Sequence, residues 1–145
     1  MRHYVIATTL LVVFSSPCVF AKSEYSPAYS TCTSSAGGNT SNLSDCSGLE
    51  LSKQSARLEK AYKTAMAVLP AEKKRNLQEA QALWVKFRDA DCGMYYSLTG
   101  GTMDLLEGAG CELSMTLERA DSLEWFAKNG AEEVGGEGDA ETDAW

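Results

Sequence analysis

Apolar and small side chains recur with helical spacing along three segments of this chain of 145 residues. Steps that alternate between three and four residues place such side chains on one face of a helix. No alternating pattern typical of β-strands occurs in the sequence. We therefore expect an all-α fold, a small antiparallel three-helix bundle. The three stripes are Leu51, Ser55, Leu58, Tyr62, Ala65 and Leu69; Leu77, Ala80, Trp84, Phe87 and Asp91; and Leu106, Ala109, Leu113, Thr116, Ala120, Leu123 and Ala127.

A shorter helix is expected before the bundle. Ser26 is a suitable N-cap, and Pro27 suits the first helical position. The pair Gly37-Gly38 should stop this helix, and the polar residues that follow offer caps for the next one.

The first 21 residues have the features of a secretory signal peptide. A short basic start precedes an uncharged apolar run of 11 residues, which is too short for a membrane helix of about 20 residues. Small residues precede a cleavage position after Ala21. Lipid attachment at Cys18 is the alternative, but Pro17 beside it fits that signal poorly. We expect a chain that begins at Lys22, has no membrane span, and lies in the periplasm or outside the cell.

Four cysteines would then remain, Cys32, Cys46, Cys92 and Cys111. In an exported chain of this size they indicate two disulfides, for which three pairings are possible. We expect the sequential pairing, Cys32 with Cys46 and Cys92 with Cys111. Each bond would close a loop of about 15 to 20 residues and stabilise the fold by about 3 kcal/mol. No pair has the short spacing of a zinc knuckle, so no metal site is expected.

The charge balance excludes nucleic acid as a partner, because phosphate binding needs a surplus of basic residues. The chain has 13 Lys and Arg against 20 Asp and Glu, a formal net charge of −7. Six acids and no base lie in residues 129–145, which we expect to form a disordered acidic tail. Residues 22–128, the expected folded domain, are nearly balanced, so acidity is expected to act mainly through the tail.

The residues available for chemistry do not predict an enzyme. The only histidine, His3, lies in the expected signal peptide, which removes His-dependent nucleophiles and His-ligated zinc. Asp89 and Asp91 are two apart on a helix and point in different directions. Glu118 and Asp121 share a face that we expect to be solvated. We expect no catalytic residues and no cofactor.

Two adjacent tyrosines lie where the second long helix enters a loop with two glycines. Neighbouring residues on a helix cannot both face the core, and exposed tyrosine is a favoured contact residue. We therefore expect a partner-binding site at this end of the bundle. Its candidate residues are Tyr95, Tyr96, Leu98, Gly100 and Gly101.

Residues 77–92, with the sequence LQEAQALWVKFRDADC, resemble the hallmark of the LprI-type lysozyme-inhibitor N-terminal domain family. The resemblance extends over about residues 25–126 and includes the segments 56–63 and 116–120. The chain departs from the family pattern at Ser55, where relatives usually have an acid nearby, and at Glu59, where they have Asn.

We expect the family-motif residues to be structural. Tyr62, Trp84 and Phe87 should pack in the core, and Arg88 should pair with Asp91 or cap nearby carbonyls. The motif residues are Tyr62, Gln81, Trp84, Phe87, Arg88, Asp89 and Arg119.

The resemblance implies an exported, disulfide-bonded helical protein of the bacterial envelope that acts by protein binding. Lysozyme inhibition is the leading function, with a basic c-type or other lysozyme as the partner. An acidic chain would be steered toward such a partner. The alternative is an envelope adaptor or toxin-neutralising protein that does not inhibit lysozyme. We expect a monomer.

Overall fold

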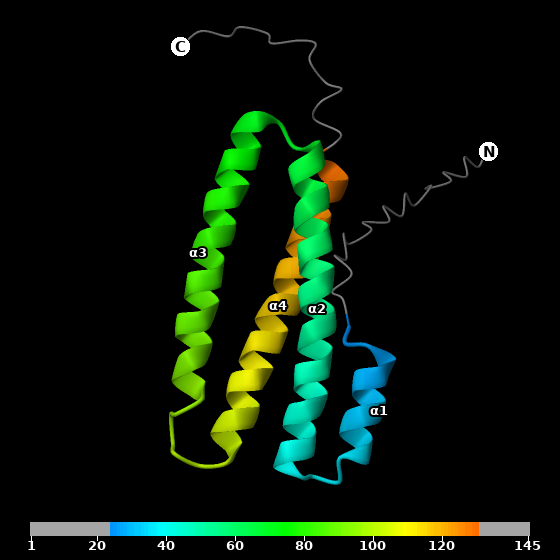
Figure 1. Ribbon diagram of the computed structural model, residues 1–145, viewed down its shortest axis with the longest axis vertical. Coiled ribbons are helices and arrows are strands. Elements are labelled where there is room, and N and C mark those ends of the chain that lie inside the picture. The colour runs from blue at the N-terminus through cyan, green and yellow to red at the C-terminus, as the bar shows by residue number, and fades with distance from the viewer. Residues whose placement is uncertain (1–23, 131–145) are drawn as a thin grey trace, which may run out of the picture.

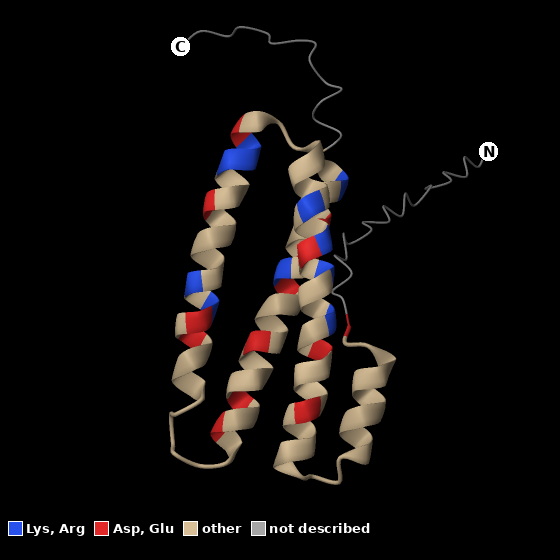
Figure 2. Ribbon diagram, viewed as in Figure 1, with Lys and Arg blue, Asp and Glu red and all other residues tan. Residues whose placement is uncertain are grey.

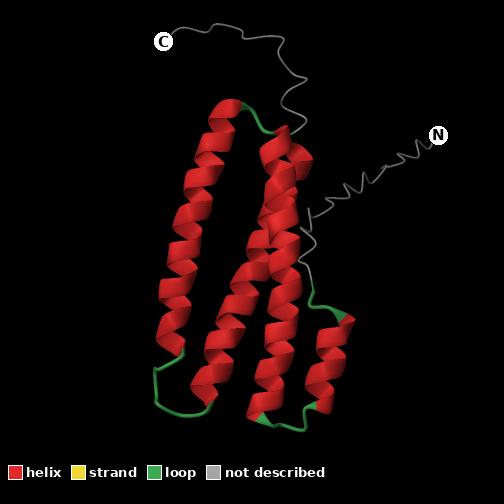
Figure 3. Cartoon of the chain, in the orientation of Figure 1, coloured by secondary structure: helices red, strands yellow, loops and turns green. Residues whose placement is uncertain are grey.

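The computed structural model describes residues 24–130, which form four helices (Figures 1 and 3). These are α1 (Pro27–Ser35), α2 (Thr40–Val68), α3 (Ala71–Tyr95) and α4 (Met103–Asn129), and the described residues contain no strand. The expected all-α bundle with a short N-terminal helix is confirmed. The expected signal peptide and residues 131–145 of the expected tail lie outside the described residues.

The turn and cap residues act where the sequence predicts. Ser26 caps α1 by accepting a hydrogen bond from the Tyr29 backbone N–H, and Pro27 is the first helical residue. Gly37 and Gly38 have φ values of 61° and 76°, a left-handed conformation that favours glycine. Asn39 then caps α2.

Helix α4 is the central element of the bundle. It lies between α2 and α3, while α1 packs beside the first half of α2 (Figure 1). The contact between α4 and α2 is much more extensive than that between α4 and α3. The core cluster contains Ala61, Ala65, Leu77 and Leu123, with Leu58, Tyr62, Met66, Leu69, Phe126 and Ala127 packed against it.

The predicted inner face of α2 is wrong in its first half. Ser55 is exposed and Leu51 is half-buried, whereas Glu50 and Gln54 are only 3% and 5% exposed. Polar side chains can be buried at low cost when they are hydrogen-bonded. Glu50 accepts bonds from the Ser26 backbone N–H and hydroxyl and from Gln54, so this face is held by polar contacts with the start of α1.

The prediction that Phe87 packs in the core is also wrong, because its side chain is 59% exposed. Helix α3 packs mainly against α4, so its inner face is narrow. That face includes the buried Leu77 and Cys92 and the half-buried Trp84. Phe87 and the exposed Ala80 lie on its flank.

Both expected disulfides are present. Cys32 bonds to Cys46 and joins α1 to α2, with a Cα–Cα distance of 5.8 Å. Cys92 bonds to Cys111 and joins the end of α3 to α4, with a Cα–Cα distance of 5.5 Å. The second bond closes the segment that contains the α3–α4 loop.

Candidate functional site

The loop between α3 and α4 is organised by one carboxylate at the start of α4. Asp104 is buried, and its oxygens accept hydrogen bonds from the Thr99 and Gly100 backbone N–H groups at 2.9 and 2.8 Å and from the Thr99 hydroxyl at 2.6 Å. The Thr99 hydroxyl bond is the main reason that the pKa of Asp104 is lowered. Gly100 has φ 75°, so the turn requires a residue without a side chain there.

The two tyrosines of the candidate site have different surroundings. The Tyr96 ring lies directly against Gly108 of α4. Burial, followed by the nearby Glu112 carboxylate, raises the pKa of the Tyr96 hydroxyl. Tyr96 therefore anchors the end of α3 on α4. Tyr95 is the last residue of α3, and its side chain is as exposed as that of Tyr96, at 38%.

Large apolar side chains are exposed around this loop. Leu98 is 61% exposed and Tyr95 is 38% exposed, and further exposed residues flank them on α3 and α4. Exposed apolar groups gathered in one place commonly mark an interaction surface. We name this end of the molecule the loop tip. It comprises Met94, Tyr95, Tyr96, Leu98, Gly100, Gly101, Met103 and Leu105.

The contact between Tyr96 and Gly108 gives a direct test of how the loop tip is held. A Cβ atom at Gly108 would lie 2.5 Å from the Tyr96 ring, so Gly108→Ala must displace that ring. We expect a loss of about 1 to 3 kcal/mol in the free energy of unfolding. A Cβ atom at Gly110 would meet nothing within 4 Å, so Gly110→Ala should raise stability by about 0.5 to 1 kcal/mol. Urea unfolding of both variants checks this, and equal effects of the two would contradict the packing.

The charges of the described residues are separated along the length of the bundle (Figure 2). The half that carries the loop tip consists of residues 24–52 and 89–118 and contains nine acids and no Lys or Arg. The prediction that acidity resides mainly in the tail therefore misses this acidic half. Its acids are Glu24, Asp45, Glu50, Asp89, Asp91, Asp104, Glu107, Glu112 and Glu118.

The opposite half is basic, and we call it the basic half. It consists of residues 53–88 and 119–130 and surrounds the α2–α3 turn. It contains five acids against eleven bases, so the near balance of the folded domain conceals two halves of opposite sign. The bases are Lys53, Arg57, Lys60, Lys63, Lys73, Lys74, Arg75, Lys86, Arg88, Arg119 and Lys128.

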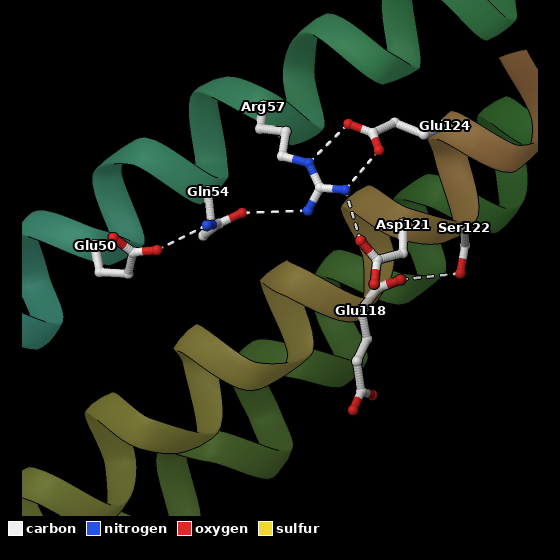
Figure 4. Close-up of polar contacts among 7 residues, drawn as sticks. All are labelled: Glu50, Gln54, Arg57, Glu118, Asp121, Ser122 and Glu124. Carbon is white, nitrogen blue, oxygen red and sulfur yellow. Dashed lines mark hydrogen bonds and ion pairs between the residues drawn. The ribbon is translucent and has the colours of Figure 1, made fainter. Parts of the chain in front are cut away.

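A polar network crosses between the two halves (Figure 4). Arg57 of α2 donates to both Glu124 oxygens and to Asp121 of α4, and more weakly to Gln54, 3.4 Å away. These acids raise the pKa of Arg57, with the Glu124 bonds as the largest cause. Burial alone would raise the pKa of Glu50, but its hydrogen bonds lower it below the ordinary value. The network joins α2 to α4, so Asp121 is not simply solvated as expected.

The family-motif residues join α3 to α4. The guanidinium carbons of Arg88 and Arg119 lie 5.0 and 5.9 Å from the Trp84 ring centroid, within the range of cation–π contacts. Arg119 also donates to Gln81 at 2.8 Å. Arg88 pairs with the neighbouring Asp89, which corrects the expected pairing with Asp91.

The structure places the candidate loop residues together at the loop tip, and the family-motif residues lie elsewhere on the bundle. Tyr62 lies on α2 beside the core cluster, and Trp84 lies between the two arginines. Sequence reasoning missed Asp104 and Gly108, which hold the loop tip. A signal for Asp104 was available, because an acid in the first turn of a helix can accept hydrogen bonds from a preceding loop.

Within residues 24–130, no helix is both long and apolar enough to cross a membrane. Over the same residues, no three His, Cys, Asp or Glu side chains gather closely enough to hold a metal ion.

Comparison with known proteins identifies the family. The family model described as Lysozyme inhibitor LprI matches residues 32–123, more than half of the chain. No curated protein and no solved structure matches. The matched range begins at the first cysteine of the first disulfide and includes the second disulfide, the arginines around Trp84 and the loop tip. The chain belongs to the LprI family of lysozyme inhibitors.

Proposed function

We propose that this protein inhibits a basic lysozyme by placing its acidic half against the enzyme and inserting the loop tip into the catalytic cleft. The family supports lysozyme as the kind of partner. The two disulfides support a location in the periplasm or outside the cell, since such bonds persist in oxidising compartments.

The observation that carries the proposal is the coincidence of the exposed loop tip with the acidic half. An inhibitor needs a protruding element that keeps its shape, because ordering a flexible loop on binding costs affinity. The loop tip is braced by Asp104, by Tyr96 on Gly108, and by the Cys92–Cys111 bond. Tyr95 and Leu98 then project as contact residues.

The charge arrangement determines how the two proteins would meet. A strongly basic enzyme is attracted to the acidic half and repelled by the basic half, so the molecule approaches with its loop tip forward. Orientation by charge raises the association rate and weakens as salt is added. The same net charge spread evenly would not favour one end.

Two double variants that lose the same number of acids from opposite halves of the molecule test this proposal. The variant Asp91→Asn with Glu107→Gln removes two acids beside the loop tip, and Glu72→Gln with Glu79→Gln removes two from α3 in the basic half. We expect the first variant to slow association with a basic lysozyme about fivefold at low salt. The second should change it by less than about twofold.

Stopped-flow or surface-binding kinetics at two salt concentrations measure these rates. The difference between the variants should shrink at high salt, where exposed charges are screened. Equal effects of the two variants would mean that only net charge matters, and would contradict binding through the acidic half.

A further inference from the structure

A concave site lies in the basic half, away from the loop tip. It is a pocket of about 250 Å³ between the first half of α3 and the last half of α4, with Leu69 of the α2–α3 turn on its wall. Ligand pockets for drug-sized molecules have about 300 to 1,000 Å³, so this one suits a smaller ligand. It is lined by Leu69, Lys73, Asn76, Leu77, Ala80, Arg119 and Phe126.

Arg119 gives this pocket a cation with unused hydrogen-bonding capacity. Its Nε atom donates to Gln81, and its guanidinium contacts the Trp84 ring. Its Nη2 atom is buried and has no hydrogen-bond partner. Burial lowers the pKa of Arg119, but an arginine remains charged at neutral pH. A buried polar group without a partner is rare in proteins and calls for an explanation, such as a water or a bound molecule that accepts its hydrogen bond.

The other lining residues define the rest of the ligand. Leu69, Leu77, Ala80 and Phe126 provide apolar walls, whereas the exposed Lys73 adds a second positive charge. An aliphatic group would occupy the apolar part, and a carboxylate would supply the acceptor that Arg119 lacks. The surrounding excess of basic residues favours an anion at this end.

We propose that this pocket binds a small aliphatic monocarboxylate, with the carboxylate at Arg119 and Lys73 and the chain against Leu77 and Phe126. Two sources have this chemistry, a free medium-chain fatty acid and the carboxyl-terminal aliphatic residue of a peptide. The site is separate from the loop tip, so ligand binding and lysozyme inhibition can be tested independently.

Calorimetric titration of the chain from Lys22 onward with octanoate tests the proposal. We expect saturable binding with one site, and binding about tenfold or more weaker for octanol, which lacks the carboxylate. A parallel titration uses N-acetyl-Ala-Ala-Leu with a free carboxylate. Tighter binding of octanoate would assign a fatty acid, and tighter binding of the peptide would assign a chain terminus.

Variants place the ligand in the pocket. Ala80→Phe fills it and should abolish octanoate binding, whereas Ala82→Phe, at an exposed position outside the lining, should not. Lys73→Gln should weaken binding about threefold, and Lys74→Gln should leave it unchanged. Arg119→Gln is less informative because it also removes the contacts with Gln81 and Trp84.

Several results would overturn this assignment. They are equal binding of octanoate and octanol, octanoate binding that survives Ala80→Phe, and no octanoate binding at millimolar concentration. Lysozyme inhibition by the same variants is a separate readout, because the lining residues lie outside the loop tip.

Discussion

Replacing Tyr95 and Leu98 together by serine is expected to weaken lysozyme inhibition by about 30-fold or more. Both side chains project from a braced loop, with exposed fractions of 38% and 61%. Truncating the few residues that dominate an interface costs about 2 kcal/mol or more, and tyrosine is enriched among them; 2 kcal/mol corresponds to about 30-fold in Kd. The measurement is the inhibition constant against a basic lysozyme.

A matched control separates the loop tip from exposed apolar surface in general. Leu83 is 58% exposed on α3, and it lies three turns before Tyr95. Leu83→Ser should change the inhibition constant by less than about twofold, because substitutions at exposed positions away from an interface have small effects. Circular dichroism should show both variants folded. If Leu83→Ser weakens inhibition as much as the double variant, the loop tip is not the contact.

Removing the Cys92–Cys111 disulfide, by changing both cysteines to alanine, is expected to have a large effect on stability and on inhibition. The bond spans 19 residues, and closing such a loop in the unfolded chain contributes about 3 kcal/mol. Cys92 is fully buried at the end of α3, so its loss also loosens the base of the loop tip. We expect a loss of about 3 kcal/mol in unfolding free energy together with weaker inhibition.

The other disulfide provides the control. Cys32–Cys46 spans 14 residues and joins α1 to α2. It lies in the acidic half but does not hold either end of the α3–α4 loop. Its removal should destabilise the chain by a similar amount, about 3 kcal/mol, but leave inhibition intact under conditions where the protein remains folded. Chemical unfolding and inhibition assays on both variants give the comparison. Equal inhibition by the two folded variants would show that rigidity of the loop tip is unimportant.

Features set by local chemistry could be predicted from the sequence. Ser26 and Pro27 start α1 because their backbone preferences act within one turn. The left-handed glycines after α1 end it for the same local reason. The number of cysteines predicted two disulfides, and the sequential pairing expected among three is confirmed. The loop between Tyr96 and Thr102 followed from its glycines.

Features that depend on how the helices meet could not be predicted. Glu50 belongs to the inner face only because Ser26, 24 residues away, donates to it. Phe87 fits the helical stripe, yet it is exposed because α3 packs mainly against α4 and has a narrow inner face. The acidic half arises because α2 and α4 run in the same direction, so their first halves lie at the end of the bundle where α3, which runs the opposite way, finishes (Figures 1 and 2). The net charge of the whole folded domain does not reveal this separation, because the charges of the two halves largely cancel.

The proposed function requires the folded domain to inhibit lysozyme through its acidic half. The most direct measurement is titration of the chain from Lys22 to Trp145 into a basic lysozyme, following lysis of cell walls at low and at high salt. We predict inhibition at a one-to-one ratio at both salts, with slower association at high salt because steering is screened. Inhibition at low salt alone would assign the effect to nonspecific charge. Absence of inhibition at both salts would contradict the proposed function while leaving the fold and the family unchanged.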